Sequence, residues 1–176
     1  MSNIVAQENK TNNWIQSIND DTEKYDKKAK KEMSSVDTTS FKETKLETFW
    51  FKKKKSIYKI KQVYDFGNNL KIEYVYYYKN DLLIKNTIFG LVPKLHKKEK
   101  KKEGSCCFIN KEVYYFKSKN QGIKKSKKFD LNFISEYELK LKEFQNIHFK
   151  MKVFNAEKSE QEYNRISNLI NGLRIY

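Results

Sequence analysis

The sequence has few of the residues from which catalytic and metal sites are built. Its only histidines are His96 and His148, and its two cysteines, Cys106 and Cys107, are adjacent. A tetrahedral metal site needs separated Cys or His pairs, and adjacent cysteines rarely bridge each other because the ring they would close is strained. A thiol–imidazole pair of either cysteine with His148 is the nucleophilic alternative, but no residue is spaced to orient that histidine. We therefore expect no metal, no cofactor and no enzymatic activity.

Glycine, proline and long apolar runs are also scarce. The five glycines form neither a phosphate loop nor a dinucleotide fingerprint. No stretch approaches the roughly 18 apolar residues of a membrane-spanning helix, and no signal peptide opens the chain. We expect a soluble, cytoplasmic protein, or an exported one if an apolar signal has been lost ahead of Ile4. The length of 176 residues predicts one domain, at 12–176, after a disordered segment at 1–11.

Arginine is scarce although the chain is strongly basic. The net charge is +15, yet arginine occurs only at Arg165 and Arg174. Arginine is preferred for bidentate contacts to phosphate and guanine, so a protein that reads nucleic acid would be expected to contain more of it. The lysine excess therefore also fits scattered, solvated lysines encoded by AT-rich codons. An electrostatic surface for nucleic acid or an anionic membrane would use Lys52, Lys53, Lys54, Lys55, Lys97, Lys98, Lys100, Lys101, Lys102, Lys124 and Lys125, with Tyr77 available for stacking.

Alternating apolar and polar residues are abundant in the middle of the chain. They predict three strands, at 57–66, 70–78 and 82–88. Three-residue loops at 67–69 and 79–81 bring all their apolar positions to one side, because directly opposed residues point to the same face.

This register makes specific pairs. It places Tyr64 opposite Ile72, and Tyr76 opposite Ile84. The prediction is an antiparallel meander with one aromatic face, shared by Tyr58, Tyr74 and Ile84, that needs a cover.

The remaining elements are expected before and after this meander in the sequence. We predict a helix from Asn12 or Asn13 to about residue 33, a linker from Ser34 to Thr44, a strand at 45–52, strands at Cys106–Ile109 and Val113–Phe116 around a tight turn at Asn110–Lys111, a helix at 131–144 capped by Asp130, a strand at 147–154 and a helix at 156–171. The fold class is therefore α+β, with a largely antiparallel sheet of about six strands, an N-terminal helix and two C-terminal helices.

Two aromatic hairpin arms resemble each other. The stretch from Glu73 reads Glu-Tyr-Val-Tyr-Tyr-Tyr-Lys, and the stretch from Glu112 reads Glu-Val-Tyr-Tyr-Phe-Lys. With a helix ahead of them, they give the chain a resemblance to small uncharacterised bacterial proteins built on one meandering antiparallel sheet. Those proteins are often exported and have no assigned chemistry, so the resemblance implies a fold and no activity.

Two classes of binding function remain. The aromatic content of 15% favours a protein-interaction module, such as an inhibitor, an immunity-type protein or an envelope-associated protein, because tyrosine and tryptophan are enriched at interfaces. Tyr74, Tyr76 and Tyr78 could instead form the core under a helix. The alternative function is the electrostatic binding of nucleic acid or an anionic membrane surface by the lysines named above.

Overall fold

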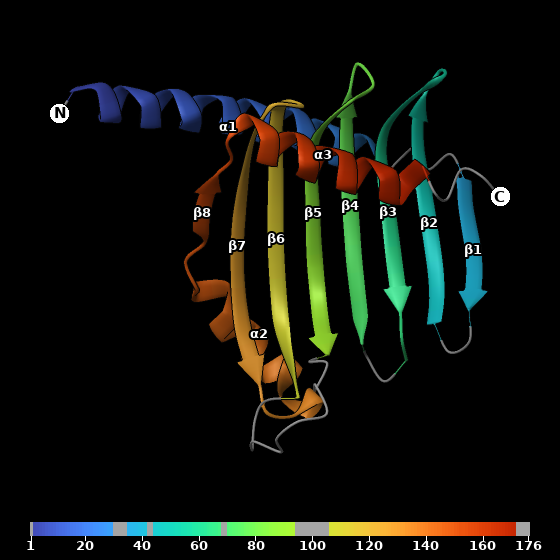
Figure 1. Ribbon diagram of the computed structural model, residues 1–176. Coiled ribbons are helices and arrows are strands. Elements are labelled where there is room, and N and C mark those ends of the chain that lie inside the picture. Colours follow the sequence, from blue (N-terminus) through green and yellow to red (C-terminus); the bar gives the residue numbers. More distant parts are fainter. Residues whose placement is uncertain (1, 30–34, 42–43, 68–69, 94–105, 172–176) are drawn as a thin grey trace.

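The described residues form one antiparallel sheet of eight strands, each paired with the next along the chain (Figure 1). The computed structural model describes residues 2–29, 35–41, 44–67, 70–93 and 106–171. The strands are β1 (Ser35–Phe41), β2 (Thr44–Lys53), β3 (Ser56–Asp65), β4 (Lys71–Lys79), β5 (Leu82–Pro93), β6 (Cys107–Ser118), β7 (Gln121–Leu131) and β8 (Lys150–Val153). The helices are α1 (Ser2–Ala29), the short 3-10 turn η1 (Ile134–Glu136), α2 (Tyr137–Asn146) and α3 (Ala156–Asn171).

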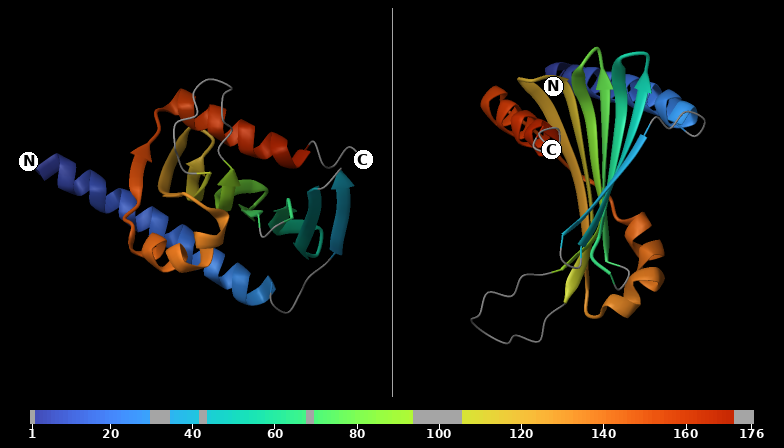
Figure 2. Two further views of the ribbon diagram at one scale, coloured as in Figure 1. Left: turned by 90° about the horizontal axis from the view of Figure 1, so that it is seen from below. Right: turned by 90° about the vertical axis from the view of Figure 1, so that its right-hand side faces the viewer.

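Helices cover the sheet on both faces (Figure 2). α1 and α2 lie on one side, called the α1 face below, and α3 crosses the other, called the α3 face. On the α3 face, Tyr163 and Ile166 of α3 pack against Tyr76, Leu83 and Phe116. The Tyr163 hydroxyl also accepts a hydrogen bond from the Leu83 backbone N–H at 3.2 Å. Tyr76, 1% exposed, is therefore a core residue.

The α1 face has a core of its own. Ile15 and Ile18 of α1 pack with Tyr77, Ile84 and Tyr115 of the sheet. At the other end of this face, Phe144 of α2 closes a second cluster of buried residues, which includes Leu91, Cys107, Ile109 and Leu131. Because both faces of the sheet are apolar and covered, the central strands carry apolar side chains on both sides.

The sheet has eight strands where the sequence predicted about six. Most of the expected linker from Ser34 to Thr44 is strand β1, because Val36, Thr38 and Thr39 favour extended backbone more than their polarity suggests. The expected turn at Asn110–Lys111 lies in the middle of β6, which runs without a break from Cys107 to Ser118. β7 is then the partner of β6.

The register of the first predicted hairpin is confirmed and that of the second is wrong. Tyr64 pairs with Ile72 between β3 and β4, as expected. Between β4 and β5, Tyr76 pairs with Asn86 and not with Ile84. The loop has two residues, Asn80 and Asp81, both in the left-handed region with φ of 52° and 60°, as two-residue hairpin turns prefer.

The prediction of one continuous aromatic face is also wrong. Tyr74 belongs to the cluster under α3, whereas Tyr58 packs with Ala29 of α1 and Ile84 packs with Ile18 of α1. The pairing shifts between Phe51 and Lys52 and between Tyr77 and Tyr78. Each shift inserts one residue and reverses the alternation beyond it, which explains the change of face.

The ends of the remaining elements differ from expectation in several places. α1 begins at Ser2, ahead of the predicted start at Asn12 or Asn13 and within the segment expected to be disordered. Asp130 lies in β7 and does not cap a helix; α2 begins at Tyr137. The strand expected at 147–154 is shortened to β8, and the helix expected at 156–171 is confirmed as α3.

Candidate functional site

Lysines converge at one end of the sheet, where the tips of two hairpins meet α1. A cleft of about 510 Å³ lies between α1, the β2–β3 tip and the β4–β5 tip. Its walls carry Lys24 and Lys28 of α1, Lys53 and Lys54 of the β2–β3 tip, and Lys79 at the end of β4. We call this the hairpin cleft.

Local structure explains why these side chains face the same hollow. Lys24 and Lys28 are four residues apart on α1 and therefore lie on one side of the helix. Lys54 occupies the turn between β2 and β3 with a φ of 56°, and both Lys53 and Lys54 are exposed. The Nζ atom of Lys28 lies 4.8 Å from the centre of the Tyr58 ring, so one wall of the cleft is aromatic.

One acidic group lies on the cleft wall and another lies beside it, paired with a cleft lysine. Asp81 lies on the wall. Lys79 pairs with Asp21 of α1 at 2.6 Å, and this hydrogen bond raises the pKa of Lys79 above its usual range. The five lysines therefore outnumber the two carboxylates, and the cleft carries a net positive charge.

A partly buried polar contact holds α1 on the sheet beside the cleft. Asp26 accepts hydrogen bonds from the Tyr77 hydroxyl at 3.0 Å and from Lys59 Nζ at 2.7 Å. Burial, with the Asp26 charge as a second cause, raises the pKa of Tyr77. Tyr77 is 7% exposed, so its predicted role as a stacking surface is wrong.

Replacing Asp26 with alanine should destabilise the fold by about 1–3 kcal/mol, because it leaves the Tyr77 hydroxyl and Lys59 without their partner. Asp20→Ala is the matched control on the same helix: Asp20 is exposed and accepts one exposed hydrogen bond from Gln16. Urea denaturation measures the free energy of unfolding of both variants. Equal free energies of unfolding for the two variants would contradict this role of Asp26.

The predicted lysines at 52–55 are only partly gathered at the cleft. Lys53 and Lys54 line it, whereas Lys55 lines a second hollow of about 630 Å³ on the α3 side of the hairpin tips, together with Lys119. Lys52 lies 5.9 Å from the Trp50 ring. No sequence pattern singles out Lys24, Lys28 and Lys79, which also line the cleft. The predicted residues Lys97, Lys98, Lys100, Lys101 and Lys102 lie outside the described residues.

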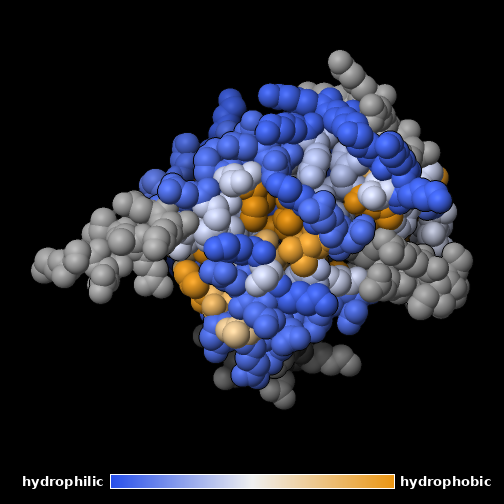
Figure 3. Space-filling model, turned by 90° about the horizontal axis from the view of Figure 1, so that it is seen from above, coloured by the Kyte–Doolittle hydropathy of each residue, from blue (hydrophilic) through white to orange (hydrophobic). Residues whose placement is uncertain are grey.

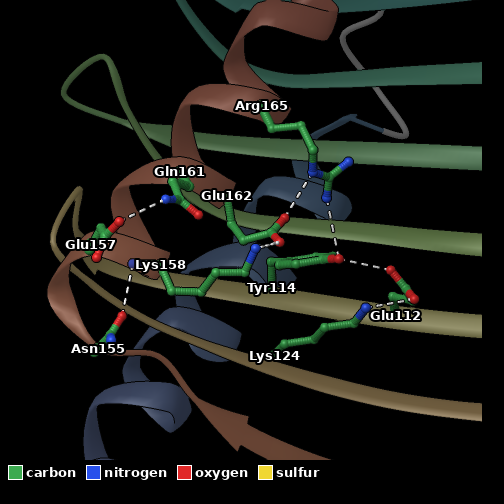
Figure 4. A network of polar contacts seen from close by, with 9 residues as sticks. All are labelled: Glu112, Tyr114, Lys124, Asn155, Glu157, Lys158, Gln161, Glu162 and Arg165. Carbon is green, nitrogen blue, oxygen red and sulfur yellow. Dashed lines mark hydrogen bonds and ion pairs between the residues drawn. The ribbon is translucent and has the colours of Figure 1, made fainter.

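Lys124 and Lys125 do not join the cleft. Lys124 lies on the α3 face in a polar network with Glu112, which it pairs at 2.7 Å (Figure 4). The Tyr114 hydroxyl donates to Glu112 at 2.9 Å and accepts from Arg165 of α3 at 3.3 Å. Lys125 is the next residue in β7 and lies on the α1 face, 5.9 Å from the Tyr115 ring. These two lysines contact side chains of β6, on opposite faces of the sheet.

The residues considered for catalysis differ in their exposure to solvent. Cys107 is buried with Ile109 and Leu131, whereas His148 is exposed ahead of β8. Within the described ranges, no three His, Cys, Asp or Glu side chains are grouped closely enough to hold a metal ion. None of the helices in the described part of the chain combines the length and apolar character needed to span a bilayer.

The surface around the hairpin tips is hydrophilic with small apolar patches (Figure 3). Ile57 and Leu82 line the hollow on the α3 side, and Ile84 lines a smaller one beside α1. Comparison with family models, with curated proteins and with solved structures gives no match for this chain. Its function must therefore be inferred from the hairpin cleft itself.

Proposed function

We propose that this protein binds nucleic acid electrostatically, through phosphate groups held in the hairpin cleft. The observation that supports the proposal is the convergence of Lys24, Lys28, Lys53, Lys54 and Lys79 on one hollow. Lysine binds phosphate as a point charge, and several ammonium groups around one hollow bind a chain of phosphates better than isolated ones do. The net charge of +15 would also steer a polyanion toward the protein.

The shape of the site favours nucleic acid over a membrane surface. The lysines line a hollow, into which a single-stranded backbone can enter, whereas a bilayer needs a flat or convex basic face with apolar residues projecting from it. Tyr25 and Tyr78, both half-buried, also line the cleft and offer ring surface to bases. Its walls carry no arginine within the described residues, so we expect binding with little sequence preference.

The aromatic content gives less support to a protein-interaction module. Tyr76, Tyr77, Tyr114 and Tyr115 are all buried. The burial of these four tyrosines is explained by the core and needs no partner protein.

The test is the binding of a fluorescent single-stranded oligonucleotide, followed by anisotropy between about 50 and 200 mM salt. The triple variant Lys24→Gln, Lys53→Gln, Lys54→Gln removes three exposed lysines of the cleft. At about 0.1 M salt it should weaken binding roughly 100-fold, and the slope of log K against log salt should become shallower by about 2.

The matched control is Lys142→Gln, Lys150→Gln, Lys152→Gln, which removes the same charge from exposed lysines away from the cleft. We expect it to keep most of the affinity. Equal weakening by both variants would contradict the cleft as the binding site. Binding to vesicles rich in anionic lipid but not to the oligonucleotide would contradict nucleic acid as the ligand.

A further inference from the structure

Among the described residues, the outer edge of β1 has no strand partner and carries only one charged side chain, Asp37. β1 is the first strand of the sheet, and among the described elements it pairs only with β2. Residues 35–40 are all exposed. Edge strands are commonly blocked by charged residues, above all lysine, or by proline; β1 contains neither lysine nor proline, and the Asp37 carboxylate accepts a hydrogen bond from Trp50 of β2. The opposite edge strand, β8, is short and carries Lys150 and Lys152.

We propose that a second copy of this chain pairs with β1, antiparallel and edge to edge, around a two-fold axis at Thr38. This register places Thr38 opposite Thr38 of the second copy, and Asp37 opposite its Thr39. All seven residues of the strand then have partners, and threonine pairs are favourable across strands. An axis at Asp37 would instead oppose two carboxylates, which is destabilising.

The side chains on β1 fit a second copy on both faces. On the α1 face, Val36 is 41% exposed and would pack beside Ser40 of the second copy. On the α3 face, Asp37 already accepts a hydrogen bond from the Trp50 indole, which holds its carboxylate over β2. The two-fold axis is perpendicular to the sheet, so the two sheets continue as one.

The like charge of the two copies and the small area of the interface make this dimer weak. The charge also sets its response to salt. Each copy carries a net charge of +15, so salt should strengthen the dimer by screening the repulsion between copies. Oligonucleotide binding should respond to salt in the opposite direction. A single strand pair buries less surface than the roughly 1,200–2,000 Å² of a stable interface, so we expect a dissociation constant in the micromolar range or above.

The experiment is sedimentation equilibrium of the full chain at increasing protein concentration, at low and moderate salt. Thr38→Lys should weaken the dimer at least roughly tenfold, because it places two lysines opposite each other on the axis. Thr38→Glu should do the same. Mixing the two variants should restore the dimer, since each pair then joins opposite charges.

Val153→Lys is the control on the other edge of the sheet, where Val153 is 64% exposed, and it should dimerise like the unmodified chain. A protein that stays monomeric at every concentration and salt tested would overturn the proposal. Dimerisation of Thr38→Lys at full strength, or failure of the mixed variants to associate, would overturn it as well.

Discussion

Raising the pH above about 10 should destabilise the protein steeply and unfold it cooperatively. Burial holds the pKa of Tyr76, Tyr77 and Tyr114 above the ordinary tyrosine value of 10.0, with the charges of Asp26 and Glu112 as further causes for Tyr77 and Tyr114. The folded state therefore keeps protons that the unfolded state loses, and stability falls as pH rises. Each group costs about 1.4 kcal/mol per pH unit, so the three together cost about 4 kcal/mol at pH 11.

Lys85 has the opposite effect on folding stability at lower pH. Its Nζ atom donates to Asn19 at 2.9 Å and Thr22 at 3.2 Å, and burial lowers its pKa below 10.5. The unfolded state then binds more protons than the folded state, so this group adds stability as pH rises toward 10.5. Above that pH its contribution is complete, and the tyrosines determine the slope.

Urea denaturation at stepped pH, with tyrosinate absorbance recorded in parallel, measures the alkaline effect. Tyr76→Phe keeps the ring, removes one titrating hydroxyl and should reduce the slope above about pH 10 by about 1.4 kcal/mol per pH unit. Its stability at neutral pH should fall by about 1 kcal/mol, because the hydroxyl donates to Gln62. Ionisation of these tyrosines near pH 10 with native circular dichroism retained would contradict the assignment.

The sequence predicted the elements whose pattern repeats without interruption. The β3–β4 hairpin was placed correctly because Tyr64 and Ile72 alternate in step on either side of one loop. The β4–β5 hairpin was not, because alternation alone does not reveal the residue inserted at Ile84. β1 was missed because serine and threonine are common to linkers and to exposed strands.

The hairpin cleft was only half visible in the sequence. The lysine run at 52–55 stands out as a cluster, and the structure places Lys53 and Lys54 on the cleft wall. Lys24 and Lys28 have helical spacing, but the acidic residues around them hide it. Only the path of α1 across the hairpin tips, held by Asp26 on Tyr77, brings the two groups together. This contact joins residues far apart in the sequence, and no local pattern encodes it.

Phe116→Ala should destabilise the core strongly, by about 3–5 kcal/mol. Phe116 is 0% exposed and lies edge-on to Tyr163 of α3, with ring centres 5.3 Å apart. It also covers Gly122 on the neighbouring strand, where a β-carbon would meet its ring at 2.9 Å. Removing the ring therefore leaves a cavity between α3 and the sheet that neither neighbour can fill.

Urea denaturation of Phe116→Ala, with Phe133→Ala as the control, tests this packing. Phe133 is 66% exposed, so its loss should change stability by less than about 0.5 kcal/mol. Oligonucleotide affinity of the folded Phe116→Ala variant should be unchanged, because Phe116 does not line the hairpin cleft. A cost below about 1 kcal/mol for Phe116→Ala would mean that α3 does not seal this face of the sheet. The network of Arg165 and Tyr114 would then lie in water, where its ion pairs contribute little to stability.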